Sequence, residues 1–264
     1  MKNPKVGLAL GSGGARGFAH IGVLKSLHRA GIPIDMIAGS SMGALVGAFY
    51  CTGHEPDTMV KMARMFRRRY YMDYTVPKMG FVSGNKVEQL MYVLTQNKKI
   101  EDLEIPFSVI ATDLLKSEKV IIREGLISEA VRASIAVPGI FVPFKKDGRL
   151  LVDGSVIDRV PVSVVREMGA DVTIAVDISH IKQNPEINTI FDVIMQSIDI
   201  MQRELVKTHE LVTDVLIRPH VENFSASAFK DIEEIIEIGE KETNKRIDDI
   251  EAAIQNWRKE NEKT

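Results

Sequence analysis

The sequence predicts an α/β protein in which a mainly parallel sheet is covered by helices on both faces. Short apolar segments alternate with helical segments along the chain, and this alternation favours parallel strands joined by helices. Residues 5–10 and 172–177 are apolar nearly throughout, as buried strands are. No internal repeat, low-complexity linker or break in composition divides the chain. We therefore expect a single domain over residues 1–264, with a charged helical C-terminal segment from about residue 229.

The composition is that of an ordinary globular protein. The 264 residues are 45% hydrophobic and 27% charged, and a formal net charge of −2 gives no electrostatic reason to expect nucleic-acid binding. Cys51 is the single cysteine, which excludes an internal disulfide and suits a reducing compartment. The N-terminus leads into a strand of about six residues rather than the apolar region of a signal peptide. We expect a cytoplasmic location.

A glycine-rich loop follows the first predicted strand. Gly11-Ser12-Gly13-Gly14-Ala15-Arg16-Gly17 leads into a helix that ends near Ala30. Such a strand-to-helix loop gathers backbone N–H groups around one point, where they can receive an anion. A dinucleotide fingerprint would need glycine where Arg16 stands, and Asp35 lies before the second strand instead of after it. The sequence therefore favours an anion-binding loop over a dinucleotide site.

The second predicted strand runs into a candidate nucleophile. Gly39-Ser40-Ser41-Met42-Gly43 fits the pattern G-x-S-x-G, in which a serine lies on a sharp strand-to-helix turn. Glycines belong on both sides because side chains would collide in such a turn. The helix that follows directs its N-terminal dipole at the Ser41 hydroxyl, which favours negative charge there. The pattern also occurs by chance in glycine-rich chains.

A membrane-spanning helix is the alternative for this stretch. Residues 36–53 are uncharged, and three glycines recur in them at the four-residue spacing of a helix-dimer face. The run is shorter than the roughly 20 apolar residues that a span needs. The Gly39-Ser40-Ser41 turn also interrupts it near its start, so we do not predict a span.

Residues 61–80 have a different composition, in which arginine and lysine alternate with methionine and tyrosine. This segment is either a helix with one solvated face and one core face, or a lid that contacts anionic lipid headgroups. The first alternative is the commoner one for such a pattern.

A second candidate for chemistry, Asp153, follows a short strand at residues 150–152. Two paired strands are expected before it at residues 107–112 and 119–122, as is a helix that ends in Ala133-Ser134-Ile135-Ala136-Val137-Pro138-Gly139. Catalytic groups in α/β sheets collect at the carboxyl ends of strands. Spacing alone nevertheless favours a turn-forming role for Asp153 beside Gly154.

The rest of the chain adds structural elements without further chemistry. A strand at 172–177, a long amphipathic helix at about 190–212 and a last strand at 215–217 precede the charged helical segment. The six histidines show no spacing typical of metal ligands, and we predict no metal.

Four motifs together resemble those of the patatin-like phospholipase family. The loop at 11–17 is similar to the family's G-x-G-G-x-R-G, and 39–43 matches its nucleophile elbow. Residues 133–139 resemble A-S-x-A-x-P-G, and Asp153-Gly154-Ser155 resembles the D-G-[GA] box. They occur in the family's order, and the size resembles that of its small bacterial members. Ser155 departs from the family pattern, and its hydroxymethyl group could alter the turn that aims Asp153.

The resemblance implies a three-layer α/β/α patatin-like fold and a Ser-Asp dyad. Ser41 would be the nucleophile and Asp153 the base, while the backbone N–H groups of Gly13 and Gly14 would form the oxyanion hole. Arg16 would either support that loop or contact a lipid phosphate. The family's chemistry implies no cofactor.

Two other possibilities remain open. In an ordinary α/β-hydrolase with a Ser-Asp-His triad, His180 or His209 would supply the base, although several strands precede the elbow in that fold. A regulatory or scaffold protein could keep the fold and bind a partner through residues 61–80 or the C-terminal helix. Because Ser41 and Asp153 are both present, we favour a serine lipid acyl hydrolase. Its expected partners are a lipid or acyl-ester substrate and an anionic membrane surface in peripheral contact. The sequence makes no prediction of oligomeric state.

Overall fold

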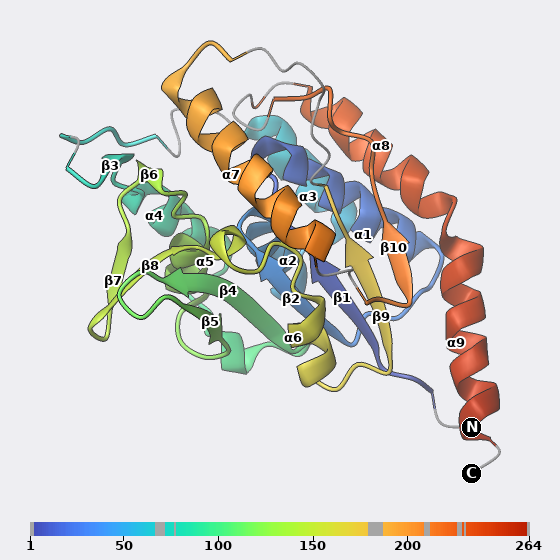
Figure 1. Cartoon of the computed structure of the whole chain (residues 1–264). Helices are drawn as coiled ribbons and strands as arrows, with labels where there is room; N and C mark the ends of the chain where they lie inside the picture. Colours follow the sequence, from blue (N-terminus) through green and yellow to red (C-terminus); the bar gives the residue numbers. More distant parts are fainter. Residues whose placement is uncertain are drawn as a thin grey trace.

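A computed structural model describes residues 3–66, 72–76, 78–178, 187–208, 212–225, 229 and 231–262, with residue 191 and residues 203–208 as backbone only (Figure 1). Arg67, Arg68, Arg69, His180 and His209 lie outside the described residues. The proposed lipid contact of the basic segment and the two histidine alternatives therefore stay predictions.

The central sheet is mainly parallel, as the sequence predicts. Five parallel strands lie side by side in the order β10 (Val215–Ile217), β9 (Val172–Val176), β1 (Val6–Leu10), β2 (Met36–Ser40) and β4 (Phe107–Asp113). Beyond them the sheet is antiparallel, with β5 (Glu118–Ile122), β8 (Arg149–Asp153) and β7 (Phe144–Lys146). A separate parallel pair joins β3 (Gly80–Val82) to β6 (Gly139–Phe141).

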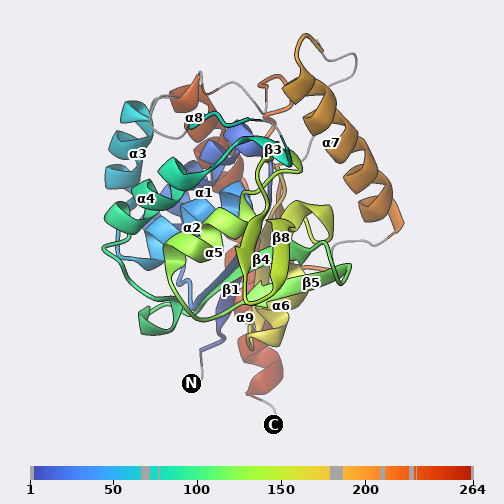
Figure 2. The same cartoon turned by 90° about the vertical axis from the view of Figure 1, so that its left-hand side faces the viewer.

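Helices form a layer on each face of the sheet, and the layers are unequal. Figure 2 shows the strands edge on, with the larger layer on one side and α6 and α7 on the other. The helices are α1 (Ala19–Arg29), α2 (Met42–Cys51), α3 (Pro56–Met65), α4 (Asn85–Leu94), α5 (Ile127–Ser134), α6 (Val162–Glu167), α7 (Ile190–Thr208), α8 (Ile232–Asn244) and α9 (Ile247–Asn261).

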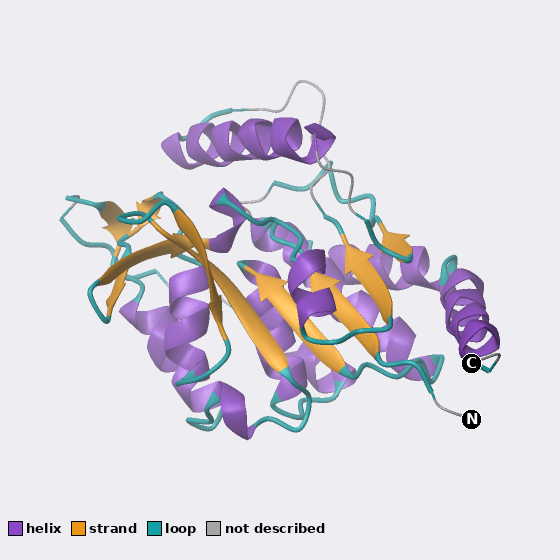
Figure 3. Cartoon of the chain, turned by 60° about the horizontal axis from the view of Figure 1, so that its bottom comes forward, coloured by secondary structure: helices purple, strands orange, loops and turns teal. Residues whose placement is uncertain are grey.

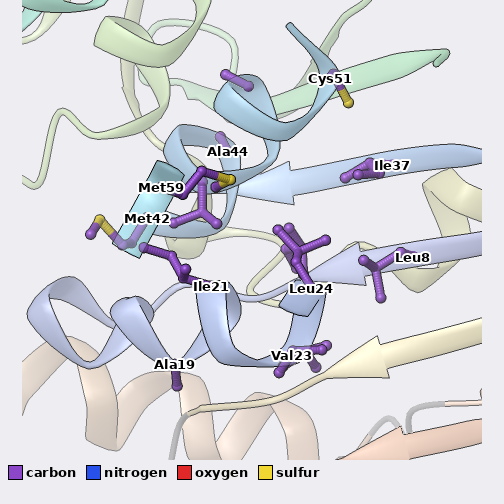
Figure 4. Close-up of a cluster of buried hydrophobic side chains, with 14 of the residues drawn as sticks. Leu8, Ala19, Ile21, Val23, Leu24, Ile37, Met42, Ala44, Cys51 and Met59 are labelled. Carbon is purple, nitrogen blue, oxygen red and sulfur yellow. The ribbon is translucent and has the colours of Figure 1, made fainter. Parts of the chain in front are cut away.

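The strand sequences explain this inequality. In β1, Leu8 and Leu10 face the larger layer, whereas Ala9 faces the short helix α6, because side chains alternate across a strand. Ala38 and Ala175 of the neighbouring strands face α6 as well. Small residues on that face let a six-residue helix lie close to the sheet, while the large side chains build the main core. Figure 4 shows part of that core, where α1 and α2 meet β1 and β2.

The charged C-terminal segment is helical and packs into the main core. Ile250 and Ile254 of α9 are buried there, and Trp257 packs against it partly buried, in keeping with their helical spacing. The uncharged run at 36–53 folds as β2 and α2. Among the described residues, no helix has the length and apolar character needed to cross a bilayer.

The basic segment begins as an ordinary surface helix. In α3, Met59 is buried in the core, whereas Lys61 and Arg64 are exposed. The described part of the segment therefore has one core face and one solvated face up to Met65, where α3 ends. Tyr74, Val76 and Met79 further along are largely exposed.

Candidate active site

Ser41 occupies a strained turn between β2 and α2. Its backbone has φ 53° and ψ −119°, a conformation that costs a non-glycine residue about 1–3 kcal/mol and persists only where the surroundings enforce it. A Cβ on Gly39 would collide with the backbone of Ala44, and one on Gly43 would collide with the Leu10 carbonyl at the end of β1. The two glycines of the predicted elbow are therefore required by close backbone packing.

Strand β4 brings the second predicted residue to the first. Along one edge, β4 pairs with β2 up to Ser40, which lies opposite Ile110. The next position of the same edge, Ala111, pairs with Asp153 of β8. Because β5 takes the opposite edge, β2 and β8 share one edge and end against each other. The sequence predicts Asp153 at the carboxyl end of a short strand, and Asp153 is the last residue of β8, which runs antiparallel to β4.

The two side chains form a direct hydrogen bond. The Ser41 hydroxyl donates to Oδ2 of Asp153 over 2.6 Å, and the backbone N–H of Ser155 donates to Oδ1 over 2.8 Å. Ser41 is 6% exposed and Asp153 is 1% exposed. The hydroxyl therefore has a carboxylate as its immediate partner, with no histidine between them.

Burial makes Asp153 a stronger base than an exposed aspartate. Loss of solvation raises the pKa of its carboxyl above the ordinary 3.8, while hydrogen bonds from Ser41 and Ser155 and the charge of Arg159 act in the opposite direction. The net direction is upward. A higher pKa favours proton transfer from a serine hydroxyl, which a free aspartate accepts poorly.

The segment at 133–139 fixes both groups, a role that its small residues did not reveal in the sequence. The hydroxyl of Ser134 accepts the backbone N–H of Ser41 over 2.8 Å. Two residues later, the carbonyl of Ala136 accepts the backbone N–H of Asp153 over 3.0 Å. One short segment at the end of α5 therefore sets the positions of both members of the pair.

The glycine-rich loop packs directly on the elbow. A Cβ on Gly17 would collide with the side chain of Met42, the residue after Ser41. Gly13 precedes a 3₁₀ helix that starts at Gly14, whose φ of 58° lies in the left-handed region. The first N–H groups of a helix have no acceptor within it, so these N–H groups need a partner outside the 3₁₀ helix. The oxyanion role of Gly13 and Gly14 stays a prediction.

Arg16 points into the protein rather than into solvent. It is 4% exposed, its Nε donates to the Gly13 carbonyl over 3.4 Å, and its Nη2 contacts Asp199 Oδ2 at 2.7 Å. Of its two predicted roles, these contacts fit support of the loop. Asp199 of α7 also binds Arg159 at 2.8 Å, and neither residue was identified from the sequence.

His20 is a further loop contact that sequence reasoning did not identify. It is fully buried, and its Nε2 donates to the carbonyl of Gly11 over 2.7 Å, a tautomer assigned from this contact. Burial lowers its pKa to about 4, so the ring is neutral at pH 7. Cys51 is buried too, and burial raises the pKa of its thiol. Within the described ranges, no group of three or more His, Cys, Asp or Glu side chains could hold a metal ion.

Fold and site define an α/β protein with a serine at a strand-to-helix elbow and a carboxylate as its direct partner. The chain belongs to the patatin-like phospholipase family, whose model matches residues 8–166. This range contains all four motifs of the sequence. The predicted fold class is confirmed.

Relatives in three organisms are similar to about two thirds of this chain. An uncharacterized NTE family protein of Mycobacterium tuberculosis is 40% identical over 186 residues, 69% of this chain and 51% of that protein. Lysophospholipase nte1 of Aspergillus fumigatus is 36% identical over 68% of this chain and 12% of its own length. Patatin-like phospholipase domain-containing protein 6 of Homo sapiens is 35% identical over 66% of this chain and 13% of its own length. The chain thus matches about half of the mycobacterial protein and a small part of the other two.

Two solved structures have the same fold. VipD from Legionella pneumophila superposes with a TM-score of 0.55 at 12% identity, covering 95% of this chain and 67% of that one. The type III effector protein ExoU superposes with a TM-score of 0.53 at 12% identity, covering 93% of this chain and 53% of that one.

The Ser155 departure from the family pattern has a measurable consequence. Ser155→Ala removes a hydroxyl that stabilises the ionised Asp153 carboxylate, so the pKa of Asp153 should rise further. Only the ionised carboxylate of Asp153 can accept a proton. As the pH is lowered, Ser155→Ala should therefore lose activity on a short p-nitrophenyl ester at a higher pH than the parent does. We expect the acid limb of the kcat/KM profile to move upward in Ser155→Ala and to stay in place in Ser155→Thr, which keeps the hydroxyl. An unmoved or lowered limb in Ser155→Ala contradicts the role given to Ser155.

Proposed function

We propose that this protein hydrolyses carboxylic ester bonds of phospholipids, lysophospholipids or related acyl esters through Ser41 and Asp153. The observation that carries the proposal is the 2.6 Å hydrogen bond between the two side chains at a strained elbow. The name of the Aspergillus relative, a lysophospholipase, supports the lipid substrate class.

The reaction would proceed through an acyl-enzyme. Ser41 Oγ attacks the ester carbonyl while Asp153 takes the hydroxyl proton, and the N–H groups of Gly13 and Gly14 receive the charge on the carbonyl oxygen. Asp153 returns the proton to the leaving alcohol as the intermediate collapses. Water then attacks the acyl carbonyl and loses a proton to Asp153. As the C–O bond to Ser41 breaks, Asp153 returns this proton to Ser41 Oγ and the fatty acid leaves.

An apolar cavity beside the elbow suits an acyl chain. It has a volume of about 190 Å³ and lies between α2, α3 and α4. Met42, the residue next to Ser41, is one of its lining residues. Figure 4 shows Met42, Met59 and Ile21, three of its lining residues, side by side. Leu, Val, Met, Phe and Ala side chains line the rest, and such a surface binds a hydrocarbon chain rather than a polar group.

Labelling with a fluorophosphonate tests the enzyme against a scaffold protein that keeps the fold. The parent should be labelled at Ser41 and should hydrolyse a p-nitrophenyl ester, whereas Ser41→Ala and Asp153→Asn should each lose hydrolysis. Asp153→Asn should keep its Tm at pH 7, because the raised pKa of Asp153 means that folding disfavours its charge. A parent that neither labels nor hydrolyses any ester would favour the scaffold function. Loss of activity in His180→Ala or His209→Ala, with Asp153→Asn still active, would favour a Ser-Asp-His triad.

The acyl cavity makes a separate prediction about chain length. Ala63→Leu fills part of the cavity, so the ratio of kcat/KM for a palmitoyl ester to that for a butyryl ester should fall by about 10-fold or more. Lys61→Leu on the exposed face of the same helix is the matched control and should leave the ratio unchanged. An unchanged ratio in Ala63→Leu would place the acyl chain elsewhere.

A further inference from the structure

A buried ion cluster lies next to the proposed catalytic pair. Asp199 bridges two arginines, with Oδ2 at 2.7 Å from Arg16 and Oδ1 at 2.8 Å from Arg159. All three residues are at least 94% buried, with exposed fractions of 4%, 5% and 6% for Arg16, Arg159 and Asp199. Two guanidinium groups face one carboxylate in this cluster.

Arg159 has more donors than the cluster has acceptors. Its Nε and Nη2 are buried, and neither has a hydrogen-bond partner among the described residues. The hydroxyl of Ser12 is also buried and has no hydrogen-bond partner among the described residues. The backbone N–H of Ser12 donates to the Arg159 carbonyl over 3.0 Å. Buried charged donors without acceptors are costly, so acceptor oxygens of an ordered water or a bound anion belong beside them.

The cluster adjoins the reacting groups on two sides. Arg16 donates to the carbonyl of Gly13 in the proposed oxyanion loop. Arg159 lies close enough to Asp153 for its charge to lower the pKa of that carboxyl. A group bound by both arginines would therefore lie near the ester carbonyl that Ser41 attacks.

The carboxylate of the cluster comes from α7, a helix that buries two polar side chains and exposes several apolar ones. In α7, Asp199 and Gln202 are buried, whereas Ile190, Val193, Ile200 and Met201 are each more than half exposed. A surface helix normally buries its apolar stripe and exposes its polar face. Figures 1 and 3 show α7 as a separate rod above the ends of the strands. The contact between Asp199 and the arginines therefore attaches α7 to the protein through a buried polar residue.

We propose that Arg16 and Arg159 form a binding site for the phosphodiester of a phospholipid or lysophospholipid substrate, and that the Asp199 carboxylate takes the place of this phosphate in the lipid-free protein. The proposal rests on the proposed function. Carboxylate and phosphate oxygens accept the same paired donors from guanidinium groups. A phosphodiester would displace Asp199, supply acceptors to Arg159, and release α7 with its apolar face outward. The enzyme would then prefer phosphorylated glycerol esters to neutral glycerides.

The test compares two substrates with the same acyl chain in the same mixed micelles, 1-palmitoyl lysophosphatidylcholine and 1-monopalmitoylglycerol. In Arg159→Gln, the ratio of their kcat/KM values should fall by about 10-fold or more, the value of a charge-assisted hydrogen bond. Effects on Ser41, Asp153 or the fold change both rates and cancel in the ratio. Asp199→Asn removes the competing charge and should raise the ratio. Arg149→Gln, at a half-exposed arginine of β8, is the control and should leave it unchanged.

Several results would overturn the proposal. A ratio that stays constant in Arg159→Gln assigns Arg159 a purely structural role. If Arg159→Gln does not fold, an unchanged or lowered ratio in Asp199→Asn contradicts the proposal equally. Inorganic phosphate and sn-glycerol 3-phosphate are tested as inhibitors of p-nitrophenyl butyrate hydrolysis. Arg159-dependent inhibition by phosphate together with a constant lipid ratio would make the cluster a free-phosphate site. Activity on both lipids without dependence on Arg159 defeats this inference alone, whereas no activity on any ester defeats the proposed function and the inference with it.

Discussion

Strand β4 offers one edge to two strands that approach from opposite directions, and the candidate site depends on this arrangement. β2 ends at Ser40 opposite Ile110, and β8 ends at Asp153 opposite Ala111, so consecutive positions of β4 carry the two chain segments that supply the pair. The chain must leave the sheet at once at this point. At Ser41 it does so through a backbone conformation with positive φ, which close packing of Gly39 and Gly43 enforces.

Hydrogen bonds around the pair stabilise the buried carboxylate of Asp153. Asp153 accepts hydrogen bonds from the Ser41 hydroxyl and the Ser155 backbone, and its own N–H is held by Ala136. The two bonds to the carboxylate reduce the cost of burying its charge without cancelling it, so burial still raises the pKa of the carboxyl above that of an exposed aspartate. The same segment that holds Asp153 also holds the Ser41 backbone through Ser134. Basicity and position thus have a common structural source.

The fold class and Ser41 can be predicted from local patterns, whereas Asp153 was assigned its role through the family resemblance. Alternating strands and helices predict the parallel sheet, and Gly39 and Gly43 mark Ser41 as the centre of a five-residue elbow pattern. The antiparallel direction of β8 was not predicted, since a three-residue apolar run has no directional signal. Asp199 and Arg159 were not identified, because they are 40 residues apart and only the folded chain brings them together. No role was assigned to Ser134 from the sequence, since its hydroxyl has a partner only in the tertiary structure.

The covalent intermediate on Ser41 tests the central claim most directly. The parent is mixed with a p-nitrophenyl ester, quenched in acid within a turnover and analysed by intact-mass and peptide mass spectrometry. The Ser-Asp arrangement predicts a mass increase of one acyl group on the peptide that contains Ser41, and no adduct in Ser41→Ala. Turnover without an acyl adduct in the parent, or an adduct on another residue, would contradict it.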